Sequence, residues 1–373
     1  MDNEMTLPKI TFGMIVLNGE PFVRFNLRAL YPFAHQIIVA EGASPYAAHA
    51  ATSDGHSTDA TLETLLRFKA EEDPENKVVL VTAEDEGHPD GFWPGEKHEQ
   101  SQAYATRATG DWLWQIDADE FYRTEDMEAI CRLLTDTRPD MVFFYLRVFM
   151  YHARLEVHGV EPEYCQCQPI ARIFRWGPGY RYVSHRPPTV TNERGDELRT
   201  LSITTAEQTA QWGWYIWHYP YLFRAQFRAK ARYYDQLGFR GGHLAEWAAE
   251  AEAMRRPRYA ILWRGLSWLD RFHGGIPDAV EQMVRFHHDY DPGANQLRSA
   301  SRLLLPLLTA YLRLLGCMRQ LSPAGVRSAY RTPSTGTTAK VQNSRLLWLK
   351  SRLRRTRLYG LARFLGLVSY NIY

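Results

Sequence analysis

The first third of the chain alternates between runs of strand-forming residues and stretches in which apolar residues recur at helical spacing. The strand-like runs are residues 10–17, 36–40, 77–82 and the run that ends at residue 117. The helical stretches are residues 21–31, 60–70 and 97–108. Strands and helices joined by connections this short predict an α/β fold, in which helices cover a mostly parallel sheet.

The fourth strand-like run ends in three carboxylates within four positions, Asp117, Asp119 and Glu120. Acidic side chains this close repel one another and have raised pKa values unless a cation lies among them. Oxygen ligands suit Mg²⁺ or Mn²⁺, and an Asp-x-Asp pair leaves coordination positions open for a diphosphate. We therefore expect a metal-assisted diphosphate site here. A solvated acidic turn is the alternative explanation of an isolated Asp-x-Asp.

Two earlier strand ends carry further candidate residues. Leu17 and Asn18 close the first strand-like run, and Glu41 closes the second. Ligands of open parallel sheets bind outside the carboxyl ends of the strands. The sequence therefore predicts that these residues lie at the same edge of the sheet as Asp117 and Asp119.

The chain after residue 125 is less regular. A helix is expected up to about residue 134, followed by strands at 141–149 and 170–176. The aromatic segment 151–220 suits an acceptor-binding region. Further helices are expected at residues 221–237, 244–254 and 277–287, and the Ser-, Thr- and Gly-rich segment 322–344 is typical of a linker.

The composition is that of a globular protein, with 45% hydrophobic and 23% charged residues. Four cysteines are too few for a disulfide scaffold. Cys165 and Cys167 lack the second cysteine pair that a zinc site of this spacing needs. No apolar signal core precedes Pro8, so we expect a cytoplasmic protein.

The net charge of +2 conceals a basic C-terminal region. No Asp or Glu follows Asp291, whereas 14 of the 44 basic residues lie between Arg298 and Arg363. The preceding part therefore holds 30 basic against 42 acidic residues. Large apolar side chains among the arginines of residues 345–368 suit a helix lying on an anionic membrane surface. A basic helix packed on the acidic part is the alternative. Nucleic acid is a less favoured partner, because no recognition module accompanies the charge.

Four elements occur in an order that resembles the family 2 glycosyltransferases, which have the GT-A fold. They are Ile15-Val16-Leu17-Asn18-Gly19-Glu20, then Glu41, then Ser57-Thr58-Asp59, and finally Asp117-Ala118-Asp119-Glu120. The resemblance covers roughly residues 8–290. It implies transfer of a sugar from a UDP- or GDP-sugar to an acceptor hydroxyl, with Mn²⁺ or Mg²⁺ as cofactor. Residues 8–125 would then form the nucleotide-sugar half and residues 126–290 the acceptor half, followed by the basic region 291–373.

The resemblance also assigns roles in the nucleotide-sugar half. Glu41 matches the acid that holds the nucleoside, and Asp119 is the first choice as metal ligand. The other residues expected to bind the nucleotide sugar are Leu17, Asn18, Asp54, Lys97, Gln100 and Asp117, of which Asp117 is the second candidate metal ligand.

The resemblance to the family is weaker after the segment that ends at Glu120. An arginine-bearing strand precedes His185, but family members often continue with His-Glu, whereas this chain has Arg186 after the histidine. The expected carboxylate base is therefore missing, and Glu161 and Glu163 are its candidate substitutes, with exposed loop acids as the alternative. His218 followed by Lys230 resembles a late family pattern. It predicts His218 as a metal ligand, or as a histidine packed among aromatic rings, and His185 and Lys230 as contacts of the acceptor or donor.

The function predicted from the sequence is a metal-dependent, inverting glycosyltransferase of bacterial surface-polysaccharide or glycolipid synthesis. Its acceptor would be a glycan or a lipid-linked molecule, and it would lie in the cytoplasm or at the inner face of the membrane. The alternatives are another metal-dependent nucleotide-sugar or nucleotidyl enzyme, and a non-enzymatic adaptor that uses the basic region to bind membrane or nucleic acid.

Overall fold

The computed structural model describes residues 7–95, 97–158, 169–223, 225–226, 229–230, 232–233, 261–262 and 267–287. Glu161, Glu163, the predicted helix 244–254 and the whole basic region lie outside the described residues. No helix among the described residues is long and apolar enough to cross a membrane.

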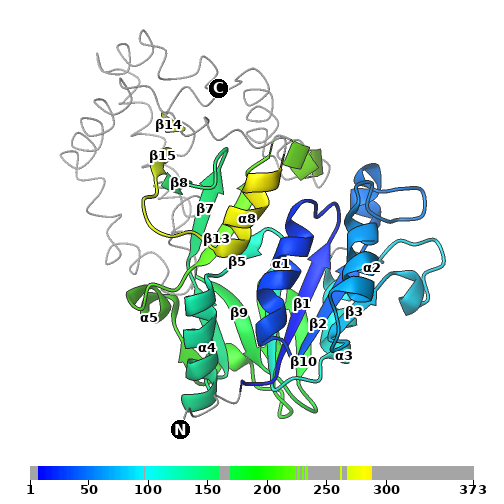
Figure 1. Cartoon of the computed structure of the whole chain (residues 1–373). Helices are drawn as coiled ribbons and strands as arrows, with labels where there is room; N and C mark the ends of the chain where they lie inside the picture. The colour runs from blue at the N-terminus through cyan, green and yellow to red at the C-terminus, as the bar shows by residue number, and fades with distance from the viewer. Residues whose placement is uncertain are drawn as a thin grey trace, which may run out of the picture.

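The central sheet has seven strands in the order β12-β6-β9-β4-β1-β2-β3 (Figure 1). Their bounds are β1 Ile10–Val16, β2 Gln36–Glu41, β3 Val78–Val81, β4 Trp112–Asp117, β6 Met141–Phe144, β9 Ile170–Arg175 and β12 Ile203–Thr204. β9 runs antiparallel to β4 and β6, and the other neighbouring pairs are parallel. The expected α/β fold with a mostly parallel sheet is therefore confirmed.

Helices cover both faces of this sheet. α1 (Phe22–Leu30), α2 (Thr61–Glu71) and α4 (Thr124–Asp136) pack on one face, and α3 (His98–Arg107) packs on the other. The hairpin of β10 (Arg181–His185) and β11 (Pro188–Thr191) lies beside α3. Gly13 makes the approach of α3 possible, because a Cβ there would lie 2.5 Å from the ring of Tyr104.

A second sheet of six strands adjoins the end of β4, with the order β14-β15-β8-β7-β13-β5 (Figure 1). Their bounds are β5 Glu120–Phe121, β7 Leu146–Met150, β8 Leu155–His158, β13 Ile216–Tyr221, β14 Ile261–Leu262 and β15 Ser267–Arg271. Stacked rings of Phe149, Trp217 and Tyr219 pack against α8 (Asp278–Phe286), which forms where a helix was predicted. The remaining short elements are α5 (Ala206–Gln211) and the 3-10 helices η1 Tyr31–Phe33, η2 Pro45–Ala50, η3 Glu84–Glu86 and η4 Leu198–Thr200.

The structure differs from the sequence prediction in the second half. The single strand expected over residues 141–149 is two strands, separated at Tyr145, because β6 joins the first sheet and β7 joins the second. The segment 151–220, expected to be irregular apart from the strand at 170–176, contains five complete strands, most of β13 and α5 among its described residues. The two sequence halves also share one sheet, since β6, β9 and β12 extend the sheet that β1 to β4 begin.

Candidate active site

The carboxyl ends of three parallel strands meet at one edge of the central sheet. Ile15 of β1 lies opposite Asp117 of β4, and Val16 lies opposite Glu41 of β2. The loops that follow β1, β2 and β4 therefore start at the same edge of the sheet, as predicted from the sequence.

The turn that carries the three carboxylates is held by a side chain from α1. Asn26 is buried, and its Nδ2 donates to the carbonyl oxygens of Asp117 (3.3 Å), Ala118 (2.9 Å) and Glu120 (2.7 Å). These carbonyls belong to the last residue of β4, the turn after it and the first residue of β5, so a single amide ties the three together. The contact fixes how Asp117 and Asp119 leave the strand.

Glu120 is a structural carboxylate. It is 1% exposed and accepts two hydrogen bonds from Arg172 of β9, from Nε at 2.8 Å and from Nη2 at 2.5 Å. Nη2 also lies 3.5 Å from Oδ2 of Asp117. A bidentate pair of this kind is directional and strong. Arg172 therefore neutralises one carboxylate and positions a second.

Asp119 lies where the two sheets meet, next to His218. β5 pairs antiparallel with β13, so that Glu120 is opposite His218, and the backbone N–H of Tyr219 donates to the carbonyl of Asp119 at 2.9 Å. This register brings Nε2 of His218 to 3.5 Å from Oδ1 of Asp119.

The second oxygen of Asp119 contacts residues beyond β13. Nζ of Lys230 lies 2.6 Å from Oδ2 and Nε2 of Gln226 lies 3.3 Å from it. Burial alone would raise the pKa of Asp119, but Lys230 and His218 outweigh burial and hold that pKa well below its usual range. Asp119 is therefore an anion at any physiological pH.

Lys97 provides a further positive charge at the head of α3. Burial would raise the pKa of Asp117, but the charges of Arg172 and Lys97 lower it. The backbone of Lys97 has a φ of 29°, outside the usual right-handed region, just before α3 begins at His98. Lys97, Arg172 and Lys230 together bring three cations to the three carboxylates.

His185, at the end of β10, is bonded to α3 in a way that defines its tautomer. Ser101 donates its hydroxyl proton to the carbonyl of Lys97 at 2.8 Å, so its oxygen accepts from Nδ1 of His185 at 2.8 Å. Burial and the nearby charge of Lys97 lower the pKa of His185 to about 4. The ring is neutral at pH 7, and Nε2 carries the lone pair that can accept a proton or a hydrogen bond.

The donors at this strand end fit a divalent cation in an open site. Asp119 and His218 bring a carboxylate oxygen and an imidazole nitrogen 3.5 Å apart. Asp117 instead faces Arg172, and no three His, Cys, Asp or Glu side chains among the described residues form a group that could hold a metal. Mg²⁺ is typically bound by one or two carboxylates together with substrate phosphates. The pair therefore suits a cation whose remaining positions are filled by a diphosphate and water.

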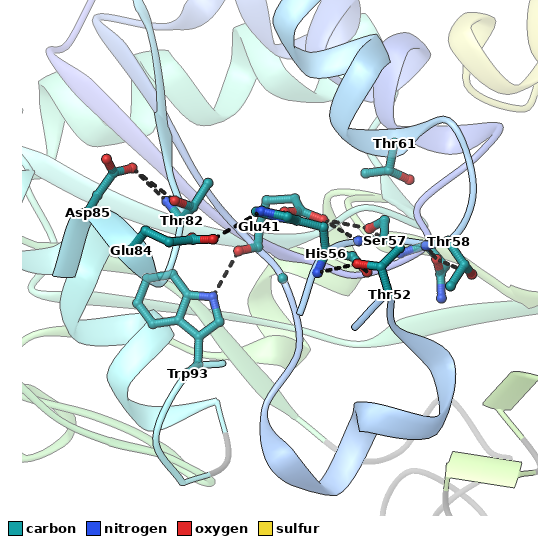
Figure 2. Close-up of polar contacts among 12 residues, drawn as sticks. Glu41, Thr52, His56, Ser57, Thr58, Thr61, Thr82, Glu84, Asp85 and Trp93 are labelled. Atoms are coloured by element: carbon teal, nitrogen blue, oxygen red, sulfur yellow. Dashed lines mark hydrogen bonds and ion pairs between the residues drawn. The ribbon is translucent and has the colours of Figure 1, made fainter. Parts of the chain in front are cut away.

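Glu41 is enclosed by the loop that follows β2 (Figure 2). It is 0% exposed, and Oε1 accepts hydrogen bonds from the backbone N–H (2.8 Å) and hydroxyl (2.7 Å) of Ser57. Nδ1 of His56 lies 2.8 Å from Oε2, and its Nε2 lies 3.2 Å from Glu84 of η3. The carboxylate thus positions the loop from within, whereas the sequence interpretation assigned it a direct contact with a nucleoside.

Two glycines let this loop approach the next one. Gly55 has a φ of +80° and a Cβ there would lie 2.0 Å from the carbonyl oxygen of Gly91. Trp93 joins the same contact, because its Nε1 donates to the Glu41 carbonyl at 2.8 Å (Figure 2). The loops after β2 and β3 are therefore joined to each other beside Glu41.

The other predicted nucleotide-binding residues lie in this region. Asn18 accepts from the N–H of Thr58 at 2.7 Å and donates to the carbonyl of Ala50 at 2.7 Å. Gln100 is buried and donates to the carbonyl of Gly42 at 2.9 Å. Leu17 is partly exposed after β1, and Asp54 is exposed in the turn before His56. Asn18 and Gln100 thus hold the loops in place, and Leu17 and Asp54 leave part of their surface open to solvent.

Sequence reasoning missed the residues that organise the site through long-range contacts. Arg172 was noted only as part of an arginine-bearing strand, and Asn26, His56 and Gln226 were given no role. The signal for Arg172 was a charged residue inside a strand with apolar neighbours, since a buried charge needs a partner. Nothing in the local sequence pairs Asn26 with the turn after β4.

No protein-family model matches the sequence. No curated protein matches it either. Among solved structures, the chain is similar to S. aureus TarS, with 14% identity over 45% of this chain and 28% of that chain and a TM-score of 0.30. It is also similar to TarS residues 1–349 in complex with UDP, with 11% identity over 66% and 73% of the two chains and a TM-score of 0.32.

A third similar structure is glucosyl-3-phosphoglycerate synthase from Mycobacterium tuberculosis in complex with Mn²⁺, UDP and glucosyl-3-phosphoglycerate. The identity is 17%, the match covers 38% of this chain and 44% of that chain, and the TM-score is 0.26. The chain thus spans less than a third of the first TarS chain and less than half of the synthase chain.

Proposed function

We propose that the protein is a glycosyltransferase of the GT-A type, which moves a sugar from a nucleotide diphosphate donor to an acceptor hydroxyl. The observation that carries the proposal is the meeting of Asp119 and His218 at the end of β4, with Lys230 beside Asp119 and the charge of Lys97 acting on Asp117. A metal-binding pair surrounded by lysines is suited to a diphosphate, because both the metal and the ammonium groups attract its oxygens.

The leaving group explains why such a site needs cations. When the bond between the sugar and the diphosphate breaks, negative charge grows on the diphosphate. A Mn²⁺ or Mg²⁺ ion held by Asp119 and His218 would stabilise that charge without a proton donor. Lys97 and Lys230 would bind the phosphate oxygens, and Arg172 would keep Asp117 and Glu120 oriented.

The nucleoside of the donor, from UDP or GDP, would lie at the loops after β1 and β2. Asn18 and Glu41 hold these loops in place, and Leu17 and Asp54 are accessible to solvent within them. We assign Glu41 a positioning role, because both of its oxygens already accept hydrogen bonds inside the protein.

The acceptor hydroxyl requires a group that takes its hydrogen bond. Nε2 of neutral His185 offers a lone pair beside Lys97 and Asp117, and we propose that it orients the acceptor or a hydroxyl of the donor sugar. An inverting transfer would place the base on the face opposite the leaving group. Glu161 and Glu163 stay candidates for that base, and both lie outside the described residues.

The cellular role follows the same proposal. The acceptor would be a glycan or lipid-linked molecule of bacterial surface-polysaccharide or glycolipid synthesis. The basic region 291–373 would hold the cytoplasmic enzyme at an anionic membrane face, since each basic residue near such a surface contributes about 1 kcal/mol.

A thermal-shift screen tests the enzyme class. A ligand that binds the native state alone stabilises it, by about 2.7 kcal/mol at a hundred times its Kd. We expect UDP or GDP with Mn²⁺ to raise the melting temperature, and UMP or GMP to raise it less. If no nucleoside diphosphate shifts the transition of the full chain with or without Mn²⁺, the proposed donor class is wrong.

A further inference from the structure

Both carboxylate oxygens of Asp119 are engaged by groups of the protein itself. Oδ1 faces Nε2 of His218 at 3.5 Å, whereas Oδ2 faces Nζ of Lys230 at 2.6 Å and Nε2 of Gln226 at 3.3 Å. The ammonium group carries a full charge at a short distance from a largely buried carboxylate. Lys230 therefore neutralises Asp119 in this structure.

This ion pair opposes a divalent cation at the same residue. A cation on Asp119 would lie about 2.0–2.1 Å from a carboxylate oxygen, and the ammonium of Lys230 already touches the other oxygen. Two positive charges a few ångströms apart repel each other, and more so where protein replaces water. Metal binding to the free protein must therefore displace Lys230 or bear its repulsion.

A diphosphate changes this balance because it gives the ammonium a new partner. The Lys230 side chain is 29% exposed, with its Nζ 5.8 Å from the centre of the Tyr221 ring, so incoming phosphate oxygens can reach it. Its flexible four-carbon stem can redirect the ammonium without moving the backbone. The anion would attract Lys230 and leave the Asp119 oxygen to the cation.

We propose that Lys230 and a divalent cation exclude each other at Asp119, so that the cation binds tightly only when a diphosphate has taken Lys230 from this carboxylate. The inference rests on the proposed function, since it assumes a diphosphate donor at this strand end. Lys230 would first pair with Asp119 and then with the diphosphate. This exchange of partners would couple the binding of the metal to the binding of the donor. Coupling of this kind is reciprocal, so each ligand raises the affinity of the other by the same factor.

The test is the binding of Mn²⁺ to the full-length protein, measured from the loss of the free-ion signal in electron paramagnetic resonance, with and without UDP. Lys230→Met removes the charge but keeps an unbranched apolar stem beside Tyr221. Without UDP, we expect this variant to bind Mn²⁺ at least ~10-fold more tightly than the wild type, because the repulsion is gone. The factor by which UDP improves Mn²⁺ binding should fall by a similar amount.

Two control variants separate this effect from a general change of charge. Lys230→Arg keeps the positive charge and should bind Mn²⁺ alone as weakly as the wild type. Lys97→Met removes a cation that acts on Asp117 and is not among the groups that most lower the pKa of Asp119, so it should change the affinity for Mn²⁺ alone by less than ~3-fold. Melting curves of all variants establish that they are folded.

The outcomes test the mutual exclusion of Lys230 and the cation separately from the proposed function. Mn²⁺ binding that is no tighter in Lys230→Met than in the wild type, or equally tightened in Lys97→Met, overturns the exclusion. Failure of UDP and GDP to bind the wild type under any condition instead overturns the proposed function. The measurement with Mn²⁺ alone needs no nucleotide and still decides whether Lys230 opposes the metal.

Discussion

Arg172 holds Glu120 by two hydrogen bonds, although the residues come from β9 and β5 of two different sheets. The guanidinium donates from Nε and Nη2 to the two carboxylate oxygens, and both side chains are at least nine-tenths buried. The pair joins the two sheets directly behind the turn that presents Asp117 and Asp119. Loss of this pair should therefore destabilise the whole fold.

Replacing Arg172 by Met should destabilise the protein strongly. The change leaves the carboxylate of Glu120 buried without its cation, and breaking a buried pair on one side costs about 3–5 kcal/mol. Urea unfolding measures the loss. The double variant Arg172→Met with Glu120→Gln should recover part of it, since no buried charge is then left unpaired. A single variant within about 1 kcal/mol of the wild type would show that the pair is not essential to the fold.

Replacing Glu41 by Ala should lower stability as well as nucleotide affinity. The sequence interpretation, in which Glu41 touches the nucleoside, predicts weaker binding with folding intact. In the structure, the loss leaves the N–H and hydroxyl of Ser57 without their partner, at about 1–3 kcal/mol for each buried group. Melting temperature and UDP affinity should be measured together. An unchanged melting temperature with weaker UDP binding would favour the direct contact.

His56 should make stability depend on pH. Burial alone would lower the pKa of His56, but the hydrogen bond to Glu41 and the charges of Glu41, Glu84 and Asp54 outweigh it and raise the pKa. A raised pKa in the folded state stabilises the protein fully below the unfolded value of about 6.5, and this contribution is lost as the pH rises through the folded pKa.

The comparison of wild type with His56→Gln isolates this contribution. The difference in their free energies of unfolding should be largest near pH 6 and should shrink as the pH is raised above neutrality. A difference that is constant from pH 6 to pH 9, or that grows as the pH is raised, would show that His56 does not bridge Glu41 and Glu84 as an imidazolium.

The first half of the fold was predictable because its signals are local. The strand and helix bounds of β1, α1, β2, α2 and β3 fall within a few residues of the predicted ranges, since each element has its own periodicity and a turn at its end. The carboxylates after β4 were predictable as a strand-end cluster for the same reason. Only Ala118 separates Asp117 from Asp119 in the sequence, so no tertiary contact is needed to bring them together.

The second half was predicted only in part. α4, β9 and α8 form close to the predicted ranges, but other strands were missed because they are short and pair over long distances. β5 has only two residues, too few to show an alternation of apolar and polar side chains. Its partner β13 follows nearly a hundred positions later, so the pairing cannot be recognised from neighbouring residues. The same pairing brings His218 to Asp119, and only the family resemblance suggested it beforehand. The enclosure of Glu41 by His56 and Ser57 depends on the path of a loop, which periodicity does not define.

The central claim is that Asp119 holds a divalent cation together with the diphosphate of a nucleotide donor. Isothermal titration of UDP into the full-length protein, with Mn²⁺ present and with Mn²⁺ chelated, tests it most directly. We expect UDP to bind at least ~10-fold more tightly with Mn²⁺ in the wild type, a gain of about 1.4 kcal/mol, and expect Asp119→Ala to lose the gain. The turnover of the Asp119→Ala variant should fall by at least ~10²-fold, as expected when one group that stabilises charge in the transition state is removed. Equal UDP affinity with Mn²⁺ present or chelated would contradict the account.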